Sequence, residues 1–331
     1  MHDLRRNDYD VTNSVQVSST AAVTAAVREL FCACWPGESF DRVAIAFDAF
    51  DRLFTGRMPG YHGVDTVYHD RQHSLDMTLA MARLIAGYEH SAEAHMRLGA
   101  DRAVMALVTA LFHDSGYIRE FDDKHHRNGA EFTLYHISRS ARFLARFLPS
   151  INMDAWVPIA TRIVHFTGYE IKLGDIQLND ERDRRLGQML GTADLIAQMA
   201  DRCYLEKCRD RLYPEFVLGG IAAVPGNDGA LQIRYSSGLD LLRQTPKFVR
   251  DTRAIRLEGE FEHAYRHLES LYSGRNPYFE AIDRNLGYLH QVLHAERWPL
   301  LRRRPPLFTS EGNQLNNVRG LMLEHLKTLW A

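Results

Sequence analysis

Apolar residues recur at helical spacing through most of the chain, and this spacing predicts an all-α fold. Apolar positions three and four residues apart, bounded by Gly, Pro or polar clusters, are typical of amphipathic helices. Helices do not alternate with buried strand-like runs, a pattern that would indicate a parallel sheet. The helical period covers residues 20–35, 40–53, 67–88, 101–112, 124–147, 154–166, 180–213, 239–242, 256–272, 277–296 and 317–330.

Two stretches break the helical pattern. Residues 1–19 are polar and without an apolar period, which predicts a mobile tail. Residues 219–234 contain a run of turn residues, Val224 to Gly229, that predicts the tip of a short hairpin. On these grounds we expect N-terminal tail and helices over 1–60, a core over 61–215, and a C-terminal helical extension packed on that core over 216–331.

Composition limits the classes of partner. The chain has 331 residues, 45% of them apolar, which is enough to bury a substantial core. Its formal net charge of −2 gives no overall attraction to nucleic acid or anionic lipid, so we expect no stable nucleic-acid binding and no membrane partner. The longest apolar run, 103–112, is too short to span a bilayer, and the N-terminus lacks an apolar signal core, so a cytoplasmic protein is expected. A homodimer stays open.

The four cysteines are sparse for this length. Their spacing lacks the partners of a zinc ribbon, which would need a second pair of ligands nearby. We therefore expect reduced thiols on helices rather than disulfides or a sulfur metal site. They are Cys32, Cys34, Cys203 and Cys208.

Histidines and aspartates recur in an ordered series from Tyr68 to Asp194. Neutral imidazole and carboxylate together suit Mn, Fe, Zn or Mg, and a carboxylate can bridge two ions. The series holds more of these groups than one tetrahedral ion needs, which predicts a two-metal site. Its segments are Tyr68-His69-Asp70-Arg71-Gln72-His73, Phe112-His113-Asp114-Ser115-Gly116-Tyr117, His126-Arg127-Asn128-Gly129-Ala130, Val164-His165-Phe166 and Thr192-Ala193-Asp194.

These motifs resemble the HD superfamily of metal-dependent phosphohydrolases over roughly residues 65–214. In that family a helix carries the first histidine, a His-Asp doublet ends a buried helix, and a distant aspartate closes the site. Members with a fuller metal set add a histidine before a Gly-Ala pair and another farther on. The resemblance implies an HD helical bundle and two divalent ions held by His73, His113, Asp114, His126, His165 and Asp194.

Within this set Asp114 is the natural bridge between the ions, because a carboxylate has two oxygens and can hold two cations. His125 lies beside His126, and the register to Gly129-Ala130 favours His126. Oxygen and imidazole ligands favour Fe or Mn, while Mg and Zn remain compatible.

The first segment is also similar to the Tyr-His-Asn-x-x-His motif of cyclic-nucleotide phosphodiesterases. His69 and His73 match it, and the resemblance implies that His69 is a general acid and His73 a metal ligand. Asp70 stands where the family has asparagine, so the likeness extends to the catalytic core and not to cyclic-nucleotide specificity. On the predicted helix, His69 and His73 are four residues apart and share a face.

The resemblance implies a phosphohydrolase that cleaves a phosphodiester or nucleotide-type ester, with metal-activated hydroxide as nucleophile and Asp114 as a catalytic ligand. A diiron oxygenase that cleaves a C–C or C–P bond is an alternative, since some HD proteins use the same six ligands for it. A non-catalytic nucleotide-binding module is a second alternative. His69 favours hydrolysis, and the complete ligand set argues against loss of catalysis.

The expected partner is a small phosphate ester or nucleotide. Gln198 lies four residues after Asp194, and Tyr169 would share a face with His165 if that helix continued. Cationic side chains near the ligands in sequence could bind phosphate oxygens. The candidate substrate-binding residues are therefore Arg71, Lys124, Tyr169 and Gln198, with Phe279 and Gln291 as candidates for the purine clamp of the phosphodiesterases.

Overall fold

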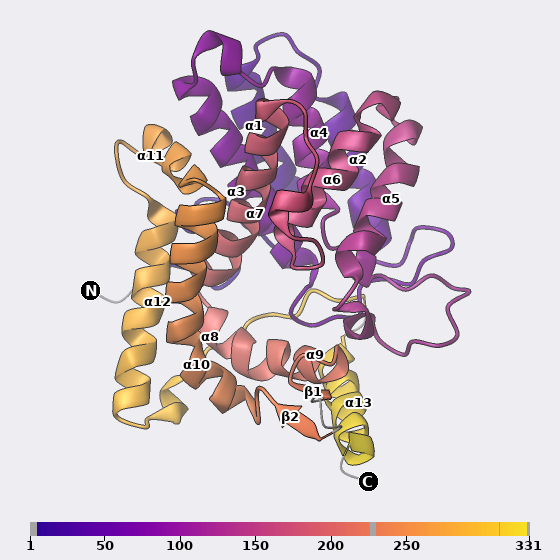
Figure 1. Cartoon of the computed structure of the whole chain (residues 1–331), viewed down its shortest axis with the longest axis vertical. Helices are drawn as coiled ribbons and strands as arrows, with labels where there is room; N and C mark the ends of the chain where they lie inside the picture. Colours follow the sequence, from indigo (N-terminus) through magenta and orange to yellow (C-terminus); the bar gives the residue numbers. More distant parts are fainter. Residues whose placement is uncertain (1–4, 226–229, 311, 330–331) are drawn as a thin grey trace.

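The computed structural model describes residues 5–225, 230–310 and 312–329, and within them the fold is all-α apart from one two-stranded hairpin (Figure 1). This confirms the predicted fold class. All four cysteines are free thiols, as expected. Among the described residues, no helix has the length and apolar character needed to cross a membrane.

Two helices at the centre of the molecule position the candidate site. They are α3 (Arg71–Ser91) and α7 (Glu181–Ala200), which pack against each other (Figure 1). Every residue of α3 from 72 to 88 is buried, because other helices surround it on all sides. Helix α4 (Ala100–Leu111) packs on both central helices and is buried from 103 to 111.

The start of α3 differs from the prediction. Asp70 is its N-cap, and the Asp70 side chain accepts a hydrogen bond from the main-chain N–H of His73 at 3.2 Å. An aspartate suits this position because its oxygen satisfies an N–H group that the helix leaves unpaired. His69 therefore lies before the helix, and the prediction that His69 and His73 share a helical face is wrong.

Residues 5–19 pack against the core, so the prediction of a mobile tail is wrong for them. Asp10 is completely buried and forms an ion pair with Arg83 of α3 at 2.6 Å. The guanidinium of Arg5 donates to the carbonyl of Ala200 at the end of α7 at 2.8 Å. The buried guanidinium of Arg83 needs a carboxylate partner, and Asp10 supplies it, which holds this segment against the core. The following helices α1 (Thr20–Cys34) and α2 (Asp41–Phe54) cover α3 and α4.

The predicted helix over 124–147 forms only in its second part, as α5 (His136–Ser150). The first part is a loop and a short 3-10 helix, η3 (Gly129–Phe132), whose N-cap Asn128 makes a capping box with Glu131. Asp65 also accepts from the main-chain N–H of Gly129 at 2.7 Å. In these bonds side-chain oxygens accept from main-chain N–H groups that would otherwise bond to carbonyls of a continuous helix. The predicted helix 154–166 is likewise divided, into η4 (Asp154–Trp156), α6 (Val157–Ile163) and η5 (Val164–Thr167).

The predicted helix 180–213 is interrupted at Asp201. Its carboxylate accepts from the main-chain N–H of Cys203 at 2.7 Å and pairs with Lys207 at 2.5 Å, which favours a local turn over the helix. Three short elements follow α7: α8 (Tyr204–Lys207), the π-helix η7 (Cys208–Leu212) and α9 (Tyr213–Leu218).

The C-terminal part adds the hairpin and a second group of helices. Strands β1 (Ala223–Pro225) and β2 (Leu231–Ile233) pair antiparallel, which confirms the predicted hairpin; residues 226–229 of the turn lie outside the described residues. The helix expected at 239–242 is longer, and a π-helix replaces the first part of the one expected at 256–272. The elements are α10 (Gly238–Asp251), η8 (Thr252–Glu260), α11 (His267–Leu271), α12 (Pro277–His294) and α13 (Gln314–Leu329).

These C-terminal helices contact the central ones. Helix α12 packs on α7, α11 packs on α3, and α13 packs on α9. Figure 1 shows α10 and α12 side by side along one edge of the molecule. As a result, α9, α10 and η8 face the part of the fold that carries the histidine series.

Candidate metal centre

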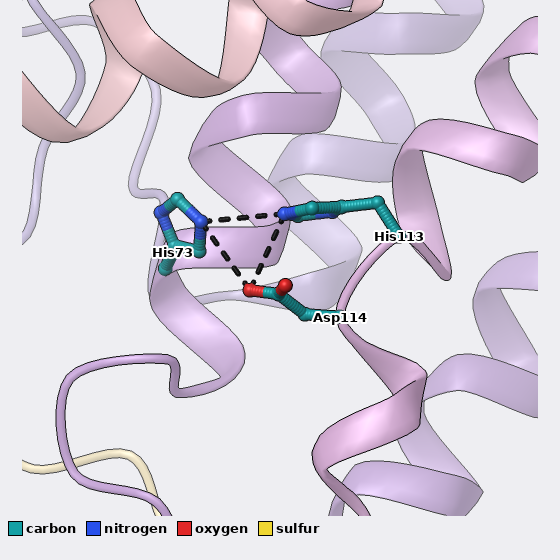
Figure 2. Close-up of side chains that lie close together, drawn as sticks. All are labelled: His73, His113 and Asp114. Atoms are coloured by element: carbon teal, nitrogen blue, oxygen red, sulfur yellow. Dashed lines mark hydrogen bonds and ion pairs between the residues drawn. The ribbon is translucent and has the colours of Figure 1, made fainter. Parts of the chain in front are cut away.

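Three buried side chains converge where α3 and α4 meet: His73, His113 and Asp114 (Figure 2). His73 is in the first turn of α3, and the doublet directly follows α4. His73 Nε2 lies 3.3 Å from His113 Nε2 and 3.4 Å from Asp114 Oδ2, and the last two atoms are 3.3 Å apart. This group could bind a metal ion.

The spacing of these atoms matches that of ligands around one ion. Ligands about 2.1 Å from a tetrahedral metal lie about 3.4 Å from one another. A fourth candidate ligand comes from α7, where Asp194 Oδ1 lies 3.2 Å from His73 Nε2 and 3.8 Å from His113 Nε2. The packing of α3 on α7 therefore brings a carboxylate about 120 residues away in sequence to the same point.

The carboxylate of Asp114 has a buried oxygen that a cation would satisfy. Oδ2 is buried and has no hydrogen-bond donor among the described residues, although it faces His73 and His113. A buried carboxylate oxygen without a donor is costly, and a bound cation is one of the few ways to compensate it. This atom supports the metal-binding interpretation independently of the distances.

Two histidines near Asp114, namely His113 and His136, are each held through Nδ1, which leaves Nε2 as the nitrogen that can bind metal. His113 Nδ1 donates to the carbonyl of Ala110 at 2.8 Å, and His136 Nδ1 donates to the carbonyl of Thr133 at 2.8 Å. With the proton on Nδ1, each ring presents the lone pair of Nε2 to the site. Such a hydrogen bond is the usual way in which proteins orient metal-binding histidines.

The pKa values in the centre reflect strong coupling between imidazole and carboxylate. Burial lowers the pKa of His113, but the Asp114 carboxylate outweighs it and raises the pKa to about 9. Burial raises the pKa of Asp114, and His113 together with the neighbouring histidines lowers it well below its usual range. The site therefore favours a positive charge beside this carboxylate, and a metal ion can supply that charge in place of a proton.

His136 is the residue that the sequence analysis missed. Its Nε2 lies 3.8 Å from Asp114 Oδ1, whereas His73 and His113 face the other oxygen, Oδ2. It is the first residue of α5, and that helix approaches the doublet so closely that a Cβ on Gly116 would lie 1.9 Å from the His136 carbonyl. The signal in the sequence was the start of an amphipathic helix at His136, which a longer predicted helix obscured.

The structure does not bring His126 to this cluster. Both ring nitrogens of His126 have partners outside the cluster: Nδ1 lies 2.9 Å from Asp123 Oδ2, and Nε2 lies 3.0 Å from the hydroxyl of Tyr135. The loop over 124–135 carries it away from Asp114, so the structure places His136, and not the predicted His126, beside this carboxylate. His165 is buried in η5, and its Nδ1 has no hydrogen-bond partner among the described residues.

His69 lies beside the centre and is held by a buried glutamate. Its Nδ1 is 2.6 Å from Glu215 Oε2, and its ring stacks on Tyr117, which stacks in turn on His136. Burial lowers the pKa of His69, but Glu215 outweighs it, so the net pKa is raised. Glu215 lies on α9, 146 residues from His69, and no motif in the sequence indicates the pair.

A cavity of about 740 Å³ opens next to the candidate ligands. His69, His73, Asp114, His136 and Asp194 line it, as do two predicted substrate-binding residues, Tyr169 and Gln198. Tyr169 is there although the helix after His165 ends at Thr167, because Gly168 redirects the chain.

The other two predicted substrate-binding residues lie elsewhere, and this part of the prediction is corrected. Arg71 forms an ion pair with Asp51 of α2 at 3.1 Å, and Lys124 donates to the carbonyl of Phe121 on an exposed loop. Neither lines the cavity. Phe279 and Gln291, the candidates for a purine clamp, do not line it either; Phe279 packs against Tyr265.

Comparison of the chain with protein-family models, with curated proteins and with solved structures found no match.

Proposed function

We propose that this protein is a metal-dependent phosphohydrolase of the HD type. The observation that carries the proposal is the arrangement around Asp114, whose two oxygens face different histidines in a buried site beside a cavity. A carboxylate with a histidine at each oxygen suits two cations, one on each side. Phosphate esters are the substrates for which a pair of divalent ions is most useful.

The chain offers two sets of ligands. His73, His113, Asp114 Oδ2 and Asp194 would hold one ion, and Asp114 Oδ1 with His136 would hold the other, with Fe or Mn favoured by the oxygen and imidazole donors. His165 remains a candidate for the second set. Bound ions would polarise the phosphoryl group and supply a hydroxide near neutral pH.

His69 is the proposed general acid. Its Nδ1 is engaged by Glu215, so Nε2 is the nitrogen that can give a proton to the leaving oxygen of an ester in the cavity. Glu215 raises the pKa of this histidine, which favours the protonated form that the role requires. Glu215 acts through His69 as a positioning residue, because it fixes the ring and stabilises its charge.

His69→Ala tests this assignment. The variant should keep its metal and lose roughly 10²–10⁴-fold in rate on an alkyl phosphate ester, whose leaving group needs a proton. On a nitrophenyl ester, which departs without a proton, the loss should be much smaller. His125→Ala, at an exposed neighbouring histidine, is the control and should change neither rate. Equal losses on both esters, or loss of metal, would refute the assignment.

Oxygen dependence separates hydrolysis from oxygenase chemistry with the same ligands. Phosphate release should proceed at the same rate in anaerobic and in aerated buffer, because water is the nucleophile. A strict requirement for O₂, with product from C–C or C–P cleavage, would contradict the proposal.

A further inference from the structure

The wall of the cavity that the C-terminal part of the chain contributes carries a group of large apolar side chains. It is built by α9, α10, the two π-helices η7 and η8 and the segment between α9 and α10, all beyond residue 207. π-helical turns are rare and often occur at functional sites, so two of them in one wall support a role in binding. The apolar side chains of this wall are Leu212, Phe216, Ile221, Tyr235, Leu241, Phe248 and Ile255.

The cations of this wall are already paired. Lys247 forms an ion pair with Asp251 one helical turn away. Arg256 pairs with Glu260 at 2.9 Å and donates to the carbonyls of Phe166 and Gly168. Among the described lining residues, no other lysine or arginine is present. Each cation of the wall therefore already has a carboxylate partner, and a second phosphate group would have to compete with that carboxylate.

Each lining glutamine amide is also engaged through at least one of its ends. Gln198 Oε1 accepts from the hydroxyl of Tyr68 at 3.1 Å, and Gln244 Nε2 donates to the carbonyl of Arg234 at 2.9 Å. Reading a base needs amide or hydroxyl groups that are free to pair with its edge. Three of the four lining threonines bond to carbonyls of their own segments instead; they are Thr133, Thr167 and Thr245.

Large apolar side chains are exposed where the cavity opens. Tyr169 is 71% exposed, Leu134 and Ile255 are each 61% exposed, and Phe248 is 40% exposed. All four line the cavity. Apolar side chains gathered at the mouth of a cavity are typical of a binding site for an apolar ligand.

We propose that the substrate is a phosphate ester whose organic part is a long, uncharged, apolar chain. This inference rests on the proposed function for the phosphate end alone. The phosphate would lie at the metal centre, and the chain would extend along α9, α10 and η8 toward Phe248 and Ile255. A nucleotide fits less well, because the lining amides already bond within the protein through at least one end and both lining cations already have a carboxylate partner.

Calorimetric titration of the full chain, supplied with Mn²⁺, with ethyl-, butyl- and octylphosphonate tests the proposal. These probes are not hydrolysed, and each methylene that enters the cavity should increase affinity by roughly fourfold. Octylphosphonate should also bind more tightly than adenosine 5′-monophosphate. Equal affinity for ethyl- and octylphosphonate, or tighter binding of the nucleotide, would overturn the proposal.

A matched pair of variants locates the binding of the chain. Ile255→Glu places a charge in the apolar wall and should weaken octylphosphonate by about tenfold or more, because a carboxylate beside an alkyl chain must stay hydrated. Ethylphosphonate should change little. Ile45→Glu makes the same substitution at a residue of α2 that is 50% exposed and outside the cavity, and it should change neither affinity. Equal effects of the two variants on octylphosphonate would overturn the proposal.

The outcomes separate this inference from the proposed function. If alkyl chain length increases affinity but no phosphate ester is hydrolysed, the apolar cavity is supported and the hydrolase assignment fails. If esters are hydrolysed with kcat/KM independent of chain length, the hydrolase assignment stands and the apolar substrate is overturned.

Discussion

Glu215 Oε2 lies 2.6 Å from Nδ1 of His69, and the Glu215 side chain is completely buried. The other oxygen of the same carboxylate accepts from the main-chain N–H groups of Val67 and Tyr68 at 2.5 and 2.6 Å. One residue of α9 thereby fixes the three residues 67–69 that lead into α3. Both the direction of the His69 ring and its protonation depend on this contact.

Glu215→Gln should shift the pH dependence of catalysis. Burial lowers the pKa of His69 and Glu215 raises it more, so removal of the carboxylate leaves the lowering cause and the pKa falls. A general acid with a lower pKa loses its proton at lower pH, so the alkaline limb of the kcat profile should move to lower pH. Glu324→Gln, at an exposed ion pair with Arg127, is the control. An unchanged alkaline limb would contradict the role of Glu215.

His136→Ala should remove one of two metal ions, because its Nε2 faces the second oxygen of Asp114. His126→Ala should leave both, since Asp123 and Tyr135 hold that ring apart from the centre. Elemental analysis of the purified variants, expressed as ions per chain, provides the measurement. Loss of an ion from His126→Ala with none from His136→Ala would reverse the assignment.

Asp114→Asn should lose both ions, because both proposed sets of ligands share this carboxylate. The amide also carries no negative charge, so it cannot stabilise the imidazolium of His113 as the Asp114 carboxylate does. Metal content and the thermal midpoint of unfolding should both fall. Retention of one full equivalent of metal would show that the carboxylate does not bridge.

His267 should make the protein less stable in acid. Burial, with a smaller contribution from Arg185, lowers the pKa of His267 to about 4, below the value near 6.5 of an unfolded chain. Between these values the unfolded state binds the proton and the folded state does not, so stability falls as pH decreases from about 6.5 to 4, by up to roughly 1.4 kcal/mol per pH unit. Urea unfolding of His267→Phe should show a weaker decrease, while the exposed-site control His290→Phe should follow the wild type. Parallel curves for both variants would exclude this histidine as the cause.

Gly87→Ala should destabilise the packing of α11 on α3. A Cβ at this position would lie 1.9 Å from the main-chain carbonyl oxygen of His267, so the two helices must move apart. We expect a loss of about 1–3 kcal/mol in the free energy of unfolding. Gly287→Ala is the matched control in α12, where a Cβ meets nothing within 4 Å, and it should be neutral or stabilising by up to about 1 kcal/mol. Equal midpoints of thermal unfolding would contradict the close approach.

The sequence could predict the helices but not where several of them stop. The apolar period of 124–147 continues across a loop, because side chains of that loop pack on the core at spacings that a helix would also use. The first part of this range is held out of a helix by the Asn128–Glu131 capping box and by Asp65, which accepts from Gly129 and lies 64 residues away. Likewise Asp201 interrupts the helix after α7 through its contact with Lys207, which periodicity does not report.

The sequence by itself determined the all-α class and the core of the candidate centre. Helical periodicity reports which residues are buried, and the His113-Asp114 doublet at the end of an apolar helix needs only short-range order to place it. Tertiary structure placed His136, and not His126, beside Asp114, paired Glu215 with His69, and built one wall of the cavity from residues beyond 207. The physical reason is that a site is a convergence of segments in space, set by the packing of helices far apart in sequence, whereas a pattern along the chain describes only what lies within a few turns.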